Sequence, residues 1–427
     1  MIAGIVLLLL LVGMHPRAMA DTRPEDLPPP PGALERELGL APADRAPAVA
    51  PDKVTALGSP IEIPFLFEGG HIIIDASIDG LTPKPFMFDT GARHMITPDT
   101  ARLLTRTSAV RTARAAGIGP KISQIEMIKV GRIAIGSATL DEPTVGVLDI
   151  PNIIVDRGAR PRLAGLIGSE LLNRYVVTID YGRHLLIFNS PGFRPSSITF
   201  SLPLGLAMSP DGLSHPSIAA ELGGVAGNFS IDTGSGGQLF LSDRFEQANK
   251  PFTESGTTLH FLSPGGIGGR LNVRMGFGKR LRIGPFELAS PVMMGPDGGG
   301  AALTGIAGII GNAVLSNFIV TIDVPAGRVH FQAVAARPLV KSIQGVGLIL
   351  DKPDHEAFEV LDVLKGTAAE RAGLRRGDRI VEIGGRPARD LGYRDIHMLD
   401  FAPVRSSITV RTSDQRRLDL TYSRLLP

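Results

Sequence analysis

The stretch Phe86-Met-Phe-Asp-Thr-Gly-Ala92, FMFDTGA, places a carboxylate between an apolar run and a glycine. Asp is disfavoured inside strands, so an Asp at the end of an apolar strand needs a reason. A turn is one reason, because Asp and Gly both favour turns. However, the stretch FSIDTGS, from Phe229 to Ser235, repeats the arrangement around Asp232. A turn explains one such triplet better than it explains two in the same setting.

A longer repeat connects the two triplets. The segment GLIGSELLNRYVVTID (165–180) aligns without gaps with GIIGNAVLSNFIVTID (308–323), and eight of the sixteen residues are identical. These segments are 143 residues apart, and so are Asp89 and Asp232. A fixed offset over this length indicates a duplicated unit. We therefore predict a first half at 59–195 and a second half at 196–337.

The composition of the 427 residues favours short strands and many turns. There are 51 Gly and 34 Pro residues, and the segment HIIIDASID (71–79) alternates between apolar and polar side chains. A short helix is predicted in TPDTARLL, with Thr97 as its N-cap and Pro98 at its first position. The formal net charge of +2 gives no argument for nucleic-acid binding, and the absence of cysteine excludes disulfides and thiol catalysis. The sequence predicts a mostly β protein.

The N-terminal residues indicate export. Residues 2–13 are apolar, too few to span a bilayer comfortably, and AMA precedes Asp21 as at a signal-peptide cleavage site. We predict a signal peptide at 1–20, with a retained single-helix anchor as the alternative. Residues 21–58, rich in Pro, Ala and charge, are predicted to be a linker or a pro-segment. The expected location is therefore periplasmic or secreted.

The doubled triplets resemble those of the aspartic peptidases, specifically the retropepsin-like group. In that group, each half contributes one Asp-Thr-Gly loop and a later motif of two apolar residues and a Gly that packs behind it. Here the later motifs read Leu166-Ile167-Gly168 and Ile309-Ile310-Gly311, each with its Gly 79 residues after the aspartate. The resemblance covers 59–337. It implies a bilobal, pseudo-two-fold β fold with both halves of the site in one chain, and hence a monomer.

The resemblance also implies the chemistry. Two close carboxylates do not both ionise readily, so Asp89 and Asp232 would share one proton, as in aspartic proteases generally. One carboxylate would take a proton from a water and the other would donate one. Thr90 and Thr233 would brace the two loops, while Gly91 and Gly234 would allow backbone to approach the carboxylates. This chemistry requires no cofactor and no metal.

Two further features of the sequence lie near these loops. The Gly-rich stretches AAGIGPK (115–121) and SPGGIGGR (263–270) lie where the group carries flap hairpins, and plain surface hairpins are the alternative. His94 follows Asp89 closely, and we interpret it as a polar loop residue rather than a catalytic one.

The last segment, 338–427, resembles the PDZ domains of bacterial envelope proteases. The resemblance is carried by KGTAAERAGLRRGDRIVEIGGRP (365–387) and by GVGLIL (345–350). It implies an α+β domain in which the loop Gly345, Val346, Gly347 and Leu348 binds the terminal carboxylate of a peptide. A domain that only braces the protease is the alternative.

Together these features predict an exported aspartic endopeptidase. Its partners would be an extended peptide or protein substrate and a C-terminal peptide tail recruited by the PDZ domain, with no nucleic acid. The alternative is a non-catalytic peptide-binding or scaffold protein that retains the protease fold. Two intact aspartates favour the enzyme.

Overall fold

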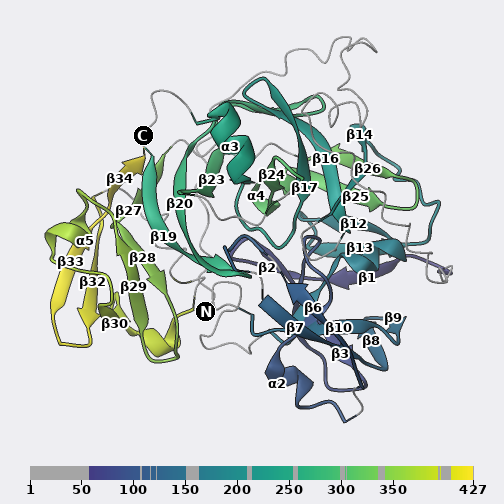
Figure 1. The fold of residues 1–427 in the computed structure, drawn as a ribbon, viewed down its shortest axis with the longest axis horizontal. Coiled ribbons are helices and arrows are strands. Elements are labelled where there is room, and N and C mark those ends of the chain that lie inside the picture. Colours follow the sequence, from purple (N-terminus) through teal and green to yellow (C-terminus); the bar gives the residue numbers. More distant parts are fainter. Residues whose placement is uncertain are drawn as a thin grey trace, which may run out of the picture.

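The computed structural model describes residues 57–105, 108–115, 117–121, 123–150, 163–208, 214–252, 258–298, 303, 305–334, 342–392, 395 and 405–426. The predicted signal peptide and all but the last two residues of the predicted linker lie outside these ranges. No helix among the described residues is long and apolar enough to cross a membrane. The prediction of a mostly β fold is confirmed, because strands make up most of the regular structure (Figure 1).

A first sheet of ten strands contains the first Asp-Thr-Gly triplet. Its order is β6-β7-β10-β5-β11-β4-β3-β8-β9, with β2 paired to β3. The strands are β2 (Leu66–Glu68), β3 (His71–Ile78), β4 (Lys84–Phe88), β5 (Met95–Ile96), β6 (Ser108–Ala115), β7 (Ser123–Lys129), β8 (Arg132–Ile135), β9 (Ala138–Asp141), β10 (Thr144–Val147) and β11 (Gly165–Ile167). The alternation predicted for β3 is present, since Ile72, Ile74 and Ile78 are buried and Asp75 is exposed.

A second sheet of ten strands contains the second triplet and has the matching order β19-β20-β23-β18-β24-β17-β16-β21-β22, with β15 paired to β16. The strands are β15 (Gly205–Met208), β16 (Ser214–Leu222), β17 (Val225–Ile231), β18 (Leu239–Leu241), β19 (Leu259–Gly266), β20 (Gly269–Phe277), β21 (Leu281–Ile283), β22 (Phe286–Leu288), β23 (Val292–Pro296) and β24 (Gly308–Ile310). Each strand of the first sheet therefore has a counterpart at the same place in the second.

A six-stranded sheet joins the two lobes in the order β1-β13-β12-β25-β26-β14. Its strands are β1 (Ile61–Pro64), β12 (Val176–Asp180), β13 (Leu185–Asn189), β14 (Phe200–Pro203), β25 (Phe318–Asp323) and β26 (Arg328–Ala333). Thr178 of β12 lies opposite Thr321 of β25 at the centre, and their hydroxyl oxygens are 2.8 Å apart. One continuous apolar core runs from the first lobe through this sheet into the second lobe.

The helices are short. They are α2 (Pro98–Ala101), η2 (Ser169–Asn173), α3 (Asp243–Asn249), α4 (Asn312–Leu315), α5 (Ala368–Arg371) and η3 (Ala388–Asp390). The predicted start of α2 is confirmed, because Thr97 is its N-cap and accepts a hydrogen bond from the Thr100 amide, and Pro98 follows it.

The C-terminal domain has its own sheet and its own core, which includes Phe358, Val360 and Ile380. The strand order is β28-β29-β30-β32-β33, with β31 paired to β30, and β27 pairs separately with β34. The strands are β27 (Ile343–Gly345), β28 (Leu348–Asp351), β29 (Phe358–Val363), β30 (Arg379–Ile383), β31 (Arg386–Pro387), β32 (Ser407–Thr412), β33 (Arg417–Thr421) and β34 (Ser423–Leu426). Figure 1 shows this domain, in yellow-green, beside β19 and β20.

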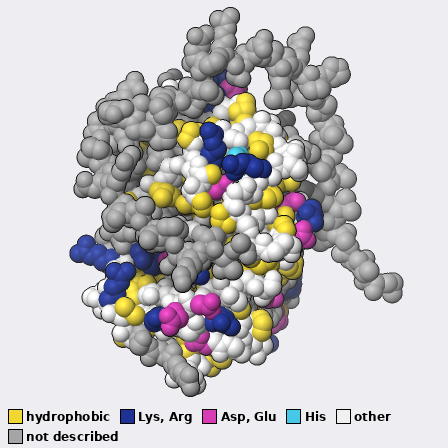
Figure 2. All heavy atoms as spheres, turned by 90° about the vertical axis from the view of Figure 1, so that its right-hand side faces the viewer, with side chains coloured by type: hydrophobic (Ala, Val, Ile, Leu, Met, Phe, Trp, Pro, Cys, Tyr) yellow, Lys and Arg dark blue, Asp and Glu magenta, His cyan; other side chains and the backbone are white. Residues whose placement is uncertain are grey.

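The face of the molecule seen in Figure 2 carries both basic and acidic side chains, in several places next to each other, with apolar side chains between them. This mixture agrees with the small net charge of the sequence.

Candidate active site

The two aspartates occupy equivalent positions at the ends of two central strands. Asp89 follows β4, which lies parallel to β11, and its amide donates to the carbonyl of Ile167 at 2.9 Å. Asp232 follows β17, which lies parallel to β24, and its amide donates to the carbonyl of Ile310 at 3.1 Å. The apolar motifs Leu166-Ile167-Gly168 and Ile309-Ile310-Gly311 therefore pack beside the triplets in both lobes. The same backbone pairing therefore positions the aspartate at the end of the strand in each lobe.

The two threonines of the triplets join the lobes by reciprocal hydrogen bonds. The amide of Thr90 donates to Oγ1 of Thr233 at 3.0 Å, and the amide of Thr233 donates to Oγ1 of Thr90 at 3.1 Å. Each hydroxyl then donates across the lobe boundary, from Thr90 to the carbonyl of Ile231 at 2.7 Å and from Thr233 to the carbonyl of Phe88 at 2.8 Å. Both threonines are fully buried. The predicted supporting residues thus meet, and they fix the two loops against each other.

The glycines of the triplets bring the two carboxylates together. A Cβ atom added to Gly91 would lie 2.6 Å from the carboxylate of Asp232, and one added to Gly234 would lie 2.5 Å from Cγ of Asp89. The amide of Gly91 also donates to Oδ1 of Asp89 at 2.9 Å, and that of Gly234 donates to Oδ1 of Asp232 at 2.8 Å. Only a residue without a side chain allows this approach.

Burial and proximity shift the acidity of the pair. Burial raises the pKa of Asp89 well above its ordinary value, and the neighbouring charge of Asp232 raises it further. Burial also raises the pKa of Asp232, but the Gly234 amide and the charge of His215 lower it. Because both carboxyls resist ionisation in this environment, the pair favours a state in which one proton is shared.

Three residues that the sequence did not identify as site residues complete the surroundings. Asn312 donates from Nδ2 to the carbonyls of Thr233 and Gly70, both at 2.7 Å, and accepts at Oδ1 from the Tyr181 hydroxyl at 2.7 Å. It follows the second motif glycine, as Ser169 follows the first, and this shared position is the signal that could have identified it. His215 of β16 lies with Nδ1 2.8 Å from Oγ of Ser230.

His94 lies in the loop after Asp89, as predicted, but its side chain is buried rather than solvated. Nδ1 accepts a hydrogen bond from the amide of Gly168 at 2.9 Å, and burial lowers the pKa of the ring. The neutral imidazole therefore connects the triplet loop to the later apolar motif of the same lobe. Its role here is to hold the loop in place.

Two hairpins, one in each lobe, carry the predicted flap segments. The first is β6–β7 and the second is β19–β20, and their Gly-rich tips are the predicted flap segments. The tips meet across the lobes, since the amide of Gly119 donates to the carbonyl of Ile267 and that of Lys121 to the carbonyl of Gly268, both at 3.1 Å. Ile118 packs on the apolar cluster of the second lobe, and Ile267 packs on that of the first. We call these hairpins the first and second flaps.

The predicted peptide-binding loop of the PDZ domain, Gly345–Leu348, connects β27 with β28. The carbonyl of Val346 accepts from the Ala369 amide at 3.0 Å, and that of Gly347 accepts from the Leu364 amide at 2.9 Å. Gly347 has a φ of 89° and lies against Thr367, so a side chain would not fit there. Leu348 opens β28, an end strand of the sheet. The loop is therefore fixed through its carbonyls.

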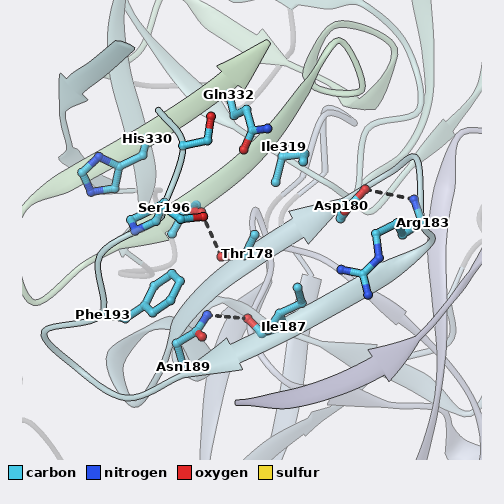
Figure 3. A pocket seen from close by; sticks show the side chains of 13 residues that line it. Thr178, Asp180, Arg183, Ile187, Asn189, Phe193, Ser196, Ile319, His330 and Gln332 are labelled. Carbon is cyan, nitrogen blue, oxygen red and sulfur yellow. Dashed lines mark hydrogen bonds between the residues drawn. The ribbon is translucent and has the colours of Figure 1, made fainter. Parts of the chain in front are cut away.

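A cavity of about 200 Å³ lies elsewhere, over the six-stranded sheet (Figure 3). Thr178, Asp180, Asn189, Ile319 and His330 contribute to its lining, and neither Asp89 nor Asp232 does. Among the described residues, no cluster of three His, Asp or Glu side chains could hold a metal ion.

Comparisons with known proteins support the interpretation of the two-lobed region and of the C-terminal domain. Residues 74–171 match the family model of the aspartyl proteases, and 359–411 match that of the PDZ domain. The predicted combination of an aspartyl protease-like region with a PDZ domain is thus confirmed.

No curated protein matches the sequence. Among solved structures, the aspartic proteinase from Irpex lacteus is similar with a TM-score of 0.40 and 13% identity, over 65% of this chain and 98% of that one. The photosystem II D1 C-terminal processing protease has a TM-score of 0.19 and 29% identity, over 20% of this chain and 24% of its own.

Proposed function

We propose that this protein is an aspartic endopeptidase whose two lobes each supply one catalytic aspartate. The observation that carries the proposal is the arrangement of Asp89, which is buried, and Asp232, which is partly buried. Each carboxylate lies close to the triplet glycine of the other lobe, and a reciprocal threonine network holds the two loops together. A scaffold has no need for two such groups, because burying a carboxylate without a counter-charge costs free energy.

The mechanism follows from the shared proton. The ionised carboxylate takes a proton from a water molecule as its oxygen attacks the peptide carbonyl carbon. The protonated carboxyl donates to the developing oxyanion, which gives a tetrahedral diol. As the carbon–nitrogen bond breaks, the proton taken from water goes to the leaving nitrogen, and one hydroxyl of the diol returns a proton to the carboxylate that donated one, which restores the shared-proton state. Burial and the charge of Asp232 raise the pKa of Asp89, and burial raises the pKa of Asp232 while the charge of His215 lowers it, so the shared proton is a property of the pair. The flaps exclude bulk water from the step.

Peptide-library cleavage at acidic and neutral pH tests the proposal, with and without a statine-type inhibitor. Cleavage that the inhibitor blocks, and that Asp89→Asn and Asp232→Asn both abolish, is the expected result. Cleavage by either single variant at a near-normal rate would exclude the two-aspartate mechanism. A wild-type protein that binds but never cuts peptides would favour the scaffold alternative.

We also propose that the enzyme is exported and monomeric. The signal-like residues 1–20 support a periplasmic or secreted location, and N-terminal sequencing of the mature protein should begin at Asp21. The matching strand orders of the two lobes support a duplication that supplies both aspartates in one chain. Specific activity should then stay constant on dilution to nanomolar concentration, whereas a second-order loss would indicate a site built between chains.

The PDZ domain is proposed to recruit substrates through Gly345–Leu348. Amide groups in such a loop bind a terminal carboxylate, and the adjacent strand pairs with the peptide. Substrates with a free apolar C-terminus should therefore have a lower KM than the same peptides with an amidated end. Equal KM values for both would exclude recruitment.

A further inference from the structure

The second flap contacts the PDZ domain along its length. β19 packs against β28 and β29, as seen in Figure 1, where the flap and these strands lie side by side. β19 is not a strand of the PDZ sheet, whose order begins with β28. The flap therefore covers a face of this sheet and leaves β28 as its end strand, where a bound peptide would pair.

Three hydrogen bonds join the second flap to the PDZ domain, and they involve five residues. The guanidinium of Arg270 donates to Oδ2 of Asp351 at 2.9 Å and to Oε2 of Glu359 at 3.2 Å. The amide of Leu262 donates to Oδ2 of Asp362 at 2.9 Å. We call Arg270, Asp351, Glu359 and Asp362 the flap clamp. The Leu262 bond involves the backbone of β19, so this contact restrains the flap strand itself and not only one of its side chains.

Apolar contacts extend the interface. Phe261 and Leu271 of the flap belong to one buried cluster with Leu364 of the PDZ domain, and Ile349 of β28 packs against that cluster. Exposed ion pairs alone contribute little to stability. The burial of these apolar side chains therefore stabilises the contact between the flap and the PDZ domain.

The clamp lies close to the flap tip. Arg270 is two residues after Gly268, whose carbonyl accepts the hydrogen bond from the first flap. On the other side, Asp351 ends β28, the strand that begins at Leu348 of the predicted peptide-binding loop. A short, continuous set of contacts therefore connects the peptide-binding loop to the tip of the second flap.

We propose that the PDZ domain positions the second flap, and that a peptide bound at Gly345–Leu348 activates hydrolysis by holding this flap in place through the clamp. This rests on the proposed endopeptidase function and extends it from recruitment to activation. A peptide that pairs with β28 orders that strand, and Ile349 and Asp351 transmit the order to the flap. A more firmly closed flap positions substrate and excludes water more completely.

The test separates activation from recruitment. The substrate is a short peptide with an amidated end, and the activator is a separate five-residue apolar peptide with a free carboxylate, with its amide as the control. At saturation the free-acid peptide should raise kcat/KM for the amidated substrate about fivefold or more, and the amide should not. Binding of the activator is measured independently by fluorescence anisotropy.

Matched variants assign the effect to the clamp. Arg270→Gln and Asp362→Ala should lose the activation while still binding the activator. Asp362→Asn keeps an acceptor for the Leu262 amide and should retain the activation. Arg282→Gln, which removes an ion pair with Glu221 on another strand of the same lobe, should also retain it.

A rate that does not rise at saturating activator, an activator that does not bind, or activation that survives both Arg270→Gln and Asp362→Ala would overturn the proposal. Hydrogen exchange of residues 259–277 provides a readout that does not need catalysis. Bound activator should slow exchange there in the wild type but not in Arg270→Gln. Unchanged exchange in the wild type refutes the coupling, whereas slowed exchange without any cleavage refutes only the endopeptidase function.

Discussion

Thr90 and Thr233 each donate an amide to the other's hydroxyl oxygen, at 3.0 and 3.1 Å, so neither triplet loop is complete without the other lobe. Because of this reciprocity, the two threonines hold the lobes together as well as fixing their own loops. It also means that the geometry of the carboxylates depends on how the lobes dock.

Replacing Thr90 by Val tests this dependence. The change removes the acceptor for the Thr233 amide and the donor to the Ile231 carbonyl, both in buried surroundings. Leaving two buried polar groups without partners should cost about 3 kcal/mol of unfolding free energy. Urea unfolding checks the value. Thr90→Ser keeps the hydroxyl and should cost much less, and equal losses for both variants would contradict the hydrogen-bonding argument.

The aspartates should stabilise the fold less as the pH rises. Their folded-state pKa values are raised above the ordinary 3.8, so the protonated form is favoured on folding. The associated stability is fully present below the unfolded pKa and is lost as the pH rises through the folded values. In Asp89→Asn the side chain at this position cannot ionise, so the variant does not lose this stability as the pH rises. Its thermal midpoint should therefore match that of the wild type near pH 3 and exceed it at neutral pH, and a midpoint below the wild type at pH 7 would contradict the pKa shift.

Much of this site could be predicted from the sequence because its determinants are local and doubled. Asp89, Asp232 and their neighbouring Thr and Gly residues lie in two triplets with one fixed offset, so the second copy identifies the first. The position of Asn312 after the motif glycine could have marked it, but its contacts could not be predicted, because Gly70 and Tyr181 reach it from turns far away in the chain. Contacts of that kind depend on how the lobes dock.

The flap clamp is likewise invisible in the sequence. Arg270 and Glu359 are ordinary charged residues of two different domains, and no spacing rule relates them. The sequence predicted a PDZ domain and a flap separately, and left recruitment and bracing as alternatives. Their contact arises from the packing of one sheet face on one hairpin, which local patterns do not encode.

The glycines of the triplets give a sharp steric prediction. A Cβ atom at residue 234 would lie 2.5 Å from Cγ of Asp89, so Gly234→Ala must displace that carboxylate. A displacement of this order costs about a hundredfold in rate, and kcat/KM should fall by at least that factor. Gly182→Ala is the matched control, because its Cβ would lie 3.4 Å from Oδ1 of Asp180, at an ordinary separation. A Gly234→Ala enzyme with more than a tenth of wild-type activity would show that the aspartates are not held as described.

The pH profile should respond to His215, which lowers the pKa of Asp232 by its charge, against the larger effect of burial. His215→Gln keeps a polar group near Ser230 but removes the charge, so the pKa of Asp232 should rise. The acidic limb of the kcat/KM profile reports ionisation of the pair in the free enzyme, and it should move to higher pH. His330→Gln is the control, since His330 is equally buried and pairs with Ser201 at 2.7 Å in the six-stranded sheet, away from both aspartates. An acidic limb that stays in place in His215→Gln, or that moves equally in His330→Gln, would show that His215 does not tune the pair.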